Sequence, residues 1–531
     1  MGPAGAALSE PSGDARRFQR HLGLLLLAAV ALRVALWAQS SALPFLDAPL
    51  YDSDVYLHQA RQLRAGRFGD PSLVAYSPLY GWVLALLGVR VPLTIALQLA
   101  LGTGTLGLVV LLARRRAGDV AGLGAGLLWL GYGLPLFYET KILSETLGLA
   151  LGAGGLALFV EGAERRSASA MARLSFAAGV VLALSTVARA SMLFALLLYP
   201  LCALPRLPSL AQGVGGAIEA TPRSPTSRRW RLARAASVAA GIALVLGANG
   251  LWNRAHTGLF VPVILVSRTA AVATQHDWRG DFRVFSETGV TGGDVSPWDV
   301  VRQAEERLRE QHQGKAMEVR GAPLWGVDLA GWIHRAPRKL LATLSDRETT
   351  FDYGYYGERS EVPVLGALPV SFGLLWVLAL GGTAGLALRR RRAGLMTLWP
   401  LVPLIAGTLV TTTLFYPTSR YRLPMALPLV LLAAELVPSL GALRRRAGGS
   451  RWFRSLLAVL LVVLAGFSLR TLARRPEQPA DWELRLAEAW MRAGDPAEAH
   501  RRMDRARALA PGDPAVLHRI EIITRAGPSA R

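Results

Sequence analysis

Apolar residues in this chain gather into runs of about 20, and short arginine-rich segments separate the runs. An α-helix of that length crosses the hydrocarbon core of a bilayer. The pattern therefore predicts an all-α polytopic membrane protein with about 11 membrane-spanning helices, in a range of about 10 to 13. The helices are expected near 22–41, 92–113, 120–137, 141–162, 170–187, 190–204, 235–252, 364–388, 395–414, 422–443 and 453–471.

The arginine clusters indicate which helix ends face the cytoplasm, because Lys and Arg accumulate in cytoplasmic segments. These clusters are 16–20, 114–116, 165–166, 206–234, 389–392 and 444–451. Together they predict a cytoplasmic N-terminus at 1–21, an outer C-terminus and a membrane domain at 22–472. Two outer loops, 42–91 and 253–362, and a flexible cytoplasmic linker, 205–234, are expected within that domain. In the second loop, Ser296 and Pro297 have the residue types of a helix start.

Composition supports the membrane assignment. The chain is 52% hydrophobic, with a mean hydropathy of +0.32. Its formal net charge of +22 could suggest a nucleic-acid partner, but the charges lie between apolar runs, so orientation in the membrane explains them and nucleic-acid binding is not expected. The single cysteine, Cys202, excludes an intrachain disulfide. The first apolar run contains Arg33 and is too long for a signal peptide, so an uncleaved helix in the inner (cytoplasmic) membrane is expected.

The character of the chain changes after Arg474. Residues 480–526 are polar and helix-forming, and small residues recur there at the spacing of one 34-residue tetratricopeptide unit. A single unit cannot bury both of its faces, because such repeats stack. The tetratricopeptide-like tail is therefore either a docking module for a protein partner or the membrane surface, or a short helical hairpin folded back on its own protein.

The segment YDSDVYLHQARQL follows the first apolar run and contains Asp52 and Asp54, flanked by Tyr51 and Tyr56. Carboxylates near lipid are costly and therefore suggest function. Three interpretations are open. Asp52 is a helix N-cap, or one aspartate is a general base, or Asp-x-Asp with His58 binds a divalent metal.

A second group of charges lies in FYETKILSETL, where Glu139, Lys141 and Glu145 adjoin an apolar run. These residues either pair with one another at the interface or contribute to a site, in which Lys141 would meet a phosphate as a point charge.

A third group lies in FYPTSRYRLPMALP, where Arg420 and Arg422 are expected at the outer rim. They either snorkel beside tyrosines as anchors or bind an anionic lipid phosphate bidentately. Arg189 is a lone basic residue between two apolar runs, and it either neutralises an acid or marks a short turn. The aromatic and acidic block 351–361 suits either sugar rings or an interface belt.

The order of these motifs resembles the bacterial GT-C membrane glycosyltransferases of the protein O-mannosyltransferase and aminoarabinose-transferase type. The resemblance rests on DSDVYLHQARQLRAG, AYSPLYGWVLALLG, FYETKILSETL, GVVLALSTVARASMLF, GLWNRAHTGLFVPV and SRYRLPMALP, which span roughly 50–428. It implies an inverting enzyme with its site on the outer, periplasmic face. The donor would be a polyprenyl-phosphate-linked sugar, and the acceptor an unidentified hydroxyl.

The resemblance also implies residue roles. Asp52, with Asp54 next in line, would be the base, although the family often has an adjacent Asp-Glu pair where this chain has Asp-Ser-Asp. Arg420 and Arg422 match the late basic motif. Further donor or substrate contacts are expected from Lys141, Arg189, Tyr51, Tyr56, Glu139 and Glu145. No cofactor is required, and a divalent metal is possible.

Two other classes stay open. A polysaccharide polymerase or ligase with a pyrophosphate-linked donor would share the outer arginines. A transporter or lipid flippase would have paired broken helices at the bilayer midplane and internal repeats, and the sequence shows neither. A non-catalytic membrane scaffold would not need Asp52, Asp54 or Arg420.

Overall fold

The computed structural model describes residues 13–204, 227–265, 329–350, 353–415, 417–445 and 479–527, and single residues at 302, 306 and 462. The expected helix at 453–471, apart from residue 462, lies outside these ranges, as do the helix start at Ser296 and residues 205–226 of the expected linker 205–234. In the described part the protein is helical and contains no strand; its β-structure is one isolated bridge, between Tyr132 and Val370.

Six segments of the described chain are long and apolar enough to cross a membrane. They are α1 (Gly13–Ser40), α5 (Val91–Ala117), α8 (Glu145–Glu164), α9 (Ala168–Ala188), α11 (Arg228–Thr257) and Ser419–Gly441, which joins α20 (Ser419–Ala433) to α21 (Leu436–Arg445). The class prediction, an all-α polytopic membrane protein, is confirmed, whereas the count of eleven stays a prediction.

Shorter apolar helices occupy four more of the expected positions. These are α6 (Asp119–Gly131), α10 (Leu193–Cys202) with η2 (Ala190–Met192), α18 (Phe372–Met396), and α19 (Val402–Leu414) with η3 (Trp399–Leu401). Several boundaries differ from expectation, and the start of α11 has a clear local cause. Because the Ser227 side chain accepts a hydrogen bond from the backbone N–H of Trp230, α11 begins at Arg228, inside the range expected as a linker.

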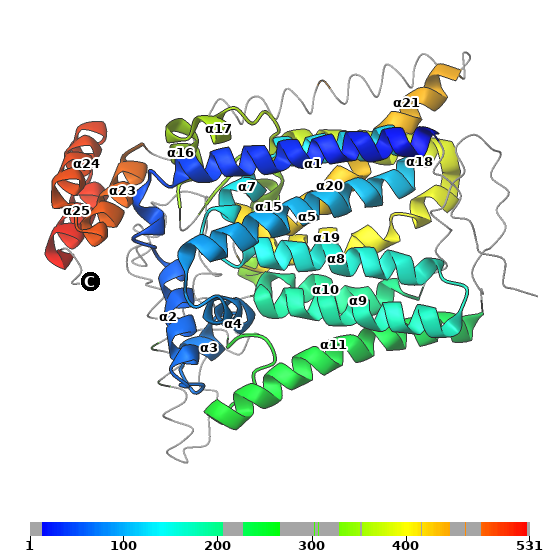
Figure 1. The fold of residues 1–531 in the computed structure, drawn as a ribbon, viewed down its shortest axis with the longest axis horizontal. Helices are drawn as coiled ribbons and strands as arrows, with labels where there is room; N and C mark the ends of the chain where they lie inside the picture. The colour runs from blue at the N-terminus through cyan, green and yellow to red at the C-terminus, as the bar shows by residue number, and fades with distance from the viewer. Residues whose placement is uncertain are drawn as a thin grey trace, which may run out of the picture.

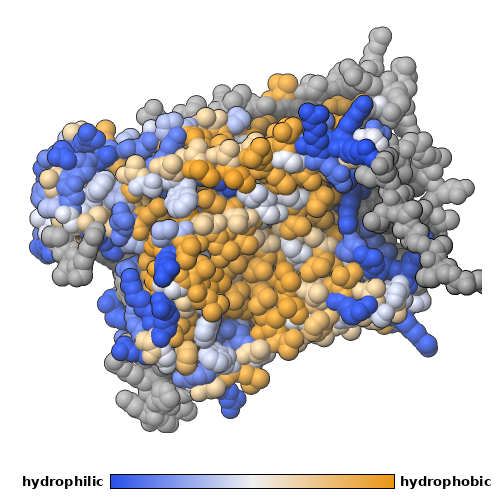
Figure 2. All heavy atoms as spheres, viewed as in Figure 1, coloured by the Kyte–Doolittle hydropathy of each residue, from blue (hydrophilic) through white to orange (hydrophobic). Residues whose placement is uncertain are grey.

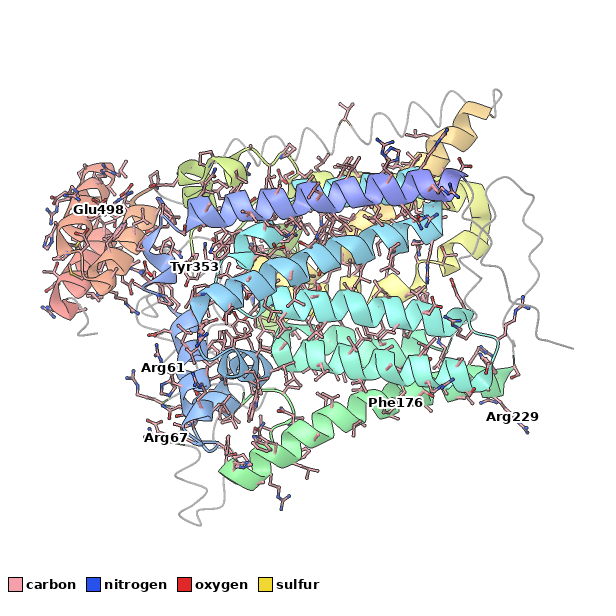
Figure 3. The ribbon with its side chains drawn as sticks, viewed as in Figure 1. Arg61, Arg67, Phe176, Arg229, Tyr353 and Glu498 are labelled. Carbon is pink, nitrogen blue, oxygen red and sulfur yellow. The ribbon has the colours of Figure 1, made fainter. Side chains whose placement is uncertain are left out.

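The long helices run side by side (Figure 1), and the bundle that they form has two polar ends (Figure 2). Figure 2 shows a broad apolar surface between these ends, as a lipid-facing belt requires. One end holds Arg229, and the other holds Arg61 and Arg67 (Figure 3). The second end is built from η1 (Pro44–Leu46), α2 (Asp52–Arg64), α3 (Ser72–Ala75), α4 (Pro78–Leu86), α7 (Gly133–Glu139), α15 (Leu329–Leu344), α16 (Tyr355–Glu361) and α17 (Pro363–Gly366).

Glycines allow the membrane helices to pack closely. A Cβ on Gly179 of α9 would lie 2.2 Å from the carbonyl oxygen of Val238, and a Cβ on Gly241 of α11 would lie 2.3 Å from that of Phe176. The α9–α11 crossing therefore brings backbone against backbone, which is typical of helix pairs that associate by close packing within lipid.

The tail forms three helices, α23 (Pro479–Ala493), α24 (Pro496–Leu509) and α25 (Pro514–Ala526), where a two-helix hairpin was expected. Asp495 and Asp513 cap the second and third, each followed by proline at the first position. Their shared core is buried and small. Trp482 of α23 packs 5.7 Å from the Phe45 ring, so the tail lies against the polar end of the membrane domain, beside η1 (Figure 1).

Candidate active site

Three helices begin close together at the polar end that carries α2. Asp52 is the first residue of α2, Glu145 the first of α8, and Arg420 the second of α20. A helix N-terminus presents backbone N–H groups without intrahelical partners and carries a partial positive charge. The side chains of these three first turns are joined by ion pairs, so the helix starts meet at one point.

Four charged side chains form this junction, the Asp52–Arg420 cluster, which consists of Asp52, Glu145, Arg189 and Arg420. Arg420 donates from Nη1 to Asp52 Oδ2 at 2.8 Å and from Nε to Glu145 Oε1 at 2.5 Å. Arg189 donates from Nη1 to the same Glu145 oxygen at 2.5 Å, and from Nη2 to the carbonyl oxygen of Arg420 at 2.7 Å. With two carboxylates and two guanidiniums, the cluster is formally neutral.

The members of the cluster differ in their access to solvent. The side chain of Glu145 is fully buried, and that of Asp52 is 16% exposed. Within the described part of the chain, Glu145 Oε2 has no hydrogen-bond partner, which is costly for a buried carboxylate oxygen. Asp52 is therefore the acid open to an incoming molecule, and Glu145 is the acid that holds the two arginines.

The backbone turns sharply just before Asp52. Tyr51 has φ 53° and ψ −123°, a conformation that costs a residue other than glycine about 1–3 kcal/mol. Tyr51 is the N-cap of α2 and provides no side-chain cap. The interpretation of Asp52 as a helix cap is wrong, because Asp52 already lies inside the helix and its carboxylate is bound by Arg420.

Tyr56 lies one turn along α2, on the same side as the cluster. Its hydroxyl is 3.2 Å from Ser144 Oγ, and its ring centroid lies 5.0 Å from that of Tyr80. Burial, reinforced by the charges of Asp52 and Glu145, raises the pKa of Tyr56, so its hydroxyl keeps its proton beside the cluster.

Three other predicted residues are bound in buried ion pairs of their own. Lys141 donates to Glu358 at 2.8 Å, and Arg422 donates to Glu348 at 2.8 Å. Glu139 accepts two hydrogen bonds from one partner, Arg33 of α1, at 2.7 and 2.8 Å. A small pocket adjoins Glu139, and its lining includes no member of the Asp52–Arg420 cluster: Gly102, Thr105, Trp129, Pro135, Glu139, Thr146, Leu149 and Leu423.

The remaining predicted residues on α2 face other partners. His58 Nε2 lies 3.2 Å from Asp70 Oδ2, and Asp54 lies 3.6 Å from Arg492 of the tail. Among the described residues there is no group of three or more His, Cys, Asp or Glu side chains that could hold a metal ion.

Several functional partners were missed from the sequence. Arg33 was detectable, since an arginine within a membrane span needs a partner. Glu358 lay in the block 351–361, which was interpreted as a sugar-binding or interfacial segment. Glu348 had no local signal, because its partner Arg422 lies 74 positions away in the chain.

The fold and the cluster together define a polytopic helical membrane protein with a charged junction at one end of an apolar bundle. No family model matches the chain, and no curated protein matches it. Solved structures do.

The apo oligosaccharyltransferase of Archaeoglobus fulgidus is 15% identical, with a TM-score of 0.38, over 93% of this chain and 60% of that one. The same protein tethered with an acceptor peptide containing the NVT sequon is 14% identical, with a TM-score of 0.39, over 92% and 58%. ArnT from Cupriavidus metallidurans bound to undecaprenyl phosphate is 15% identical, with a TM-score of 0.33, over 78% of both chains.

This chain thus spans about 60% of the length of the oligosaccharyltransferase chain. TM-scores below 0.5 describe a loose likeness, so the contacts within this chain carry the functional proposal.

Proposed function

We propose that this protein is an inverting membrane glycosyltransferase. It transfers a sugar from a polyprenyl-phosphate-linked donor to an acceptor hydroxyl at the outer face of the inner membrane. The observation that supports this proposal most strongly is the Asp52–Arg420 pair. A carboxylate that is 16% exposed is held by a guanidinium where three helix N-termini meet, at the end of the bundle that carries α2 (Figure 1).

The junction suits the donor's phosphate. An anion is stabilised by helix N-termini and by the planar guanidinium group, and the polyprenyl tail can stay in lipid beside the apolar belt. Arg420 and Arg189 are the arginines that meet the phosphate in this proposal. Lys141 and Arg422, already paired with Glu358 and Glu348, support the fold around it.

Arg420 links donor binding to the function of Asp52 as a base, because one guanidinium serves both the carboxylate and the phosphate. The donor phosphate competes with Asp52 for the N–H groups of Arg420. Once Arg420 turns to the phosphate, the Asp52 carboxylate loses its ion-pair partner and can accept a proton more readily. Glu145 keeps Arg420 in place during this exchange, because its contact is through Nε rather than Nη1.

The chemical step then follows. The acceptor oxygen attacks the anomeric carbon on the face opposite the phosphate and forms the new C–O bond. The bond between the anomeric carbon and the phosphate oxygen breaks, and its electron pair leaves with polyprenyl phosphate. Asp52 takes the acceptor's proton, and Arg420 and Arg189 stabilise the charge that develops on the leaving phosphate.

The test is transfer by the purified protein in vesicles that contain a radiolabelled polyprenyl-phosphate sugar, with a panel of hydroxyl acceptors. We expect a labelled product with inverted anomeric configuration and release of polyprenyl phosphate. A parallel arm offers a pyrophosphate-linked donor, and exclusive use of that donor would identify the polymerase or ligase class. A chelator arm tests metal dependence. Consumption of neither donor would refute the proposal.

A further inference from the structure

The tail reaches the turn that precedes the proposed base. Arg519 of α25 donates from Nη2 to the Tyr51 hydroxyl and, at 3.1 Å, to Glu488 Oε2 of α23. The guanidinium carbon lies 6.0 Å from the Tyr51 ring centroid. Glu488 is thus the acid within the tail that fixes the direction of Arg519.

We propose that Arg519 is a positioning residue: by holding Tyr51, the tail aims Asp52 at the reacting centre. This inference rests on the role proposed above for Asp52. It assigns the tail a part in the active site of its own chain, in place of docking to a separate protein.

The backbone conformation of Tyr51 explains why this residue must be held in place. We call the contact between Arg519 and Tyr51 the clamp. A residue other than glycine keeps a positive φ only where its surroundings hold it there. Tyr51 and Asp52 are adjacent, so a relaxation of the Tyr51 backbone would move Asp52 away from Arg420. Burial raises the pKa of Tyr51, so the clamped group is a neutral hydroxyl facing a cation.

The tail also contacts the segment around Asp52 through other residues. Arg492 of α23 lies 3.6 Å from Asp54 Oδ2, two residues beyond Asp52. On the other side, Trp482 packs against Phe45 and donates to Glu361 Oε1 at 3.4 Å. The tail therefore contacts the chain both before and after the proposed base.

The Trp482 ring is closely packed against α16. A Cβ on Gly357 of α16 would lie 2.2 Å from the Trp482 ring, so the two surfaces are in close contact. Arg502 of α24 adds an ion pair with Glu361 at 2.9 Å. A tail anchored to α16 in this way can hold a strained turn on the neighbouring segment.

The experiment compares Arg519→Ala, Arg519→Lys and Tyr51→Phe with Arg525→Ala in the full-length protein. Arg525 is the matched control, because it is 78% exposed on the same helix and pairs within that helix with Glu521. The readouts are kcat, donor KM, and hydrogen exchange of the backbone over residues 44–58. Arg519→Ala is also measured in the Asp52→Asn background.

For Arg519→Ala we expect a fall in kcat of about 10–100-fold, the scale of a small misplacement of a reacting group, with donor KM within about twofold. Tyr51→Phe should also lower kcat, and Arg519→Lys should lower kcat less than Arg519→Ala does. Exchange over 44–58 should rise for Arg519→Ala and stay unchanged for Arg525→Ala. In the Asp52→Asn background Arg519→Ala should cost nothing further, because both changes act through one carboxylate.

Wild-type kcat in Arg519→Ala and Tyr51→Phe, or an undiminished further loss in the Asp52→Asn background, would overturn the inference. If Arg519→Ala does not fold, two measurements on Tyr51→Phe decide whether the inference holds: its kcat, and its further loss of activity in the Asp52→Asn background. Hydrogen exchange separates this inference from the proposed function. Unchanged exchange over 44–58 shows that no clamp exists, whatever the activity. Raised exchange in a protein that consumes neither lipid-linked donor leaves the clamp standing and refutes the transferase.

Discussion

Replacing Asp52 by Asn removes the proton acceptor and keeps the shape of the side chain. The amide oxygen of Asn can still accept from Arg420 Nη1, which lies 2.8 Å from the carboxylate it replaces. The proposed reaction needs a group that takes a proton, and an amide does not do so. Asp52→Asn therefore separates the chemical role of this residue from its role in the fold.

The stability cost of this change follows from the contacts of Arg420. Removing one partner of a buried ion pair costs about 3–5 kcal/mol when the other charge is stranded. Here Arg420 keeps Glu145 at 2.5 Å, and Asp52 is 16% exposed. What is lost is the difference between a charged and a neutral hydrogen bond, so the expected fall in the free energy of unfolding is about 1 kcal/mol.

The effect on rate is expected to be much larger. General-base assistance contributes about 10²–10⁴-fold, and a 10²-fold loss corresponds to about 2.7 kcal/mol in the activation barrier. The assay is transfer of a labelled sugar from polyprenyl phosphate in vesicles, with thermal unfolding and donor binding measured on the same preparations. Asp54→Asn is the comparison, because Asp54 faces Arg492 rather than Arg420, and it should lose less.

Two results would refute this reasoning. Full transfer by Asp52→Asn with none by Asp54→Asn would move the base by two residues. Full transfer by both would mean that neither carboxylate takes the proton.

The other predictions concern the donor phosphate, the helix packing and the topology. Arg420→Lys keeps the charge but loses the two-pronged geometry that spans Asp52 and Glu145, so donor use should weaken, and Arg420→Ala should retain little or none; equal and full activity in both would show that Arg420 only anchors the helix. Gly241→Ala should destabilise the α9–α11 crossing by about 1–3 kcal/mol in a thermal unfolding assay, whereas Gly247→Ala on the same helix, with nothing within 4 Å, should not; equal stability of the two would contradict the packing argument. Reporter fusions after Arg116 and Arg392 should lie inside and a fusion after Arg531 outside, and an inner signal from the last would rule out eleven crossings.

The apolar runs predicted the helices well, because the hydropathy of a run is a local property that needs no knowledge of the rest of the chain. A segment that cannot leave its backbone polar groups unsatisfied in lipid must be helical. Ten of the expected runs coincide with described helices, including the run that contains Arg33. Boundaries failed where a local cap extended a helix, as Ser227 does for α11.

The charged residues were recognised one by one, but their pairing was not predictable. Arg420 is 368 positions from Asp52 and 275 from Glu145, and nothing in the local pattern links them. For the same reason Arg422 looked equivalent to Arg420. The helical turn sends Arg422 to Glu348 instead, in a separate buried pair.

The Arg33–Glu139 pair has a consequence for how the protein is made. Its members are 106 positions apart, so α1 leaves the ribosome and reaches the membrane before its partner has been synthesised. Until then Arg33 must be accommodated without Glu139, at about 2.5–3.5 kcal/mol on the scale measured for insertion of an arginine at the centre of a helix. The long apolar segment of α1 around Arg33 offsets this insertion cost. Glu139 of α7 then becomes available as the partner of Arg33, so the charge within α1 is neutralised only after α7 has been synthesised.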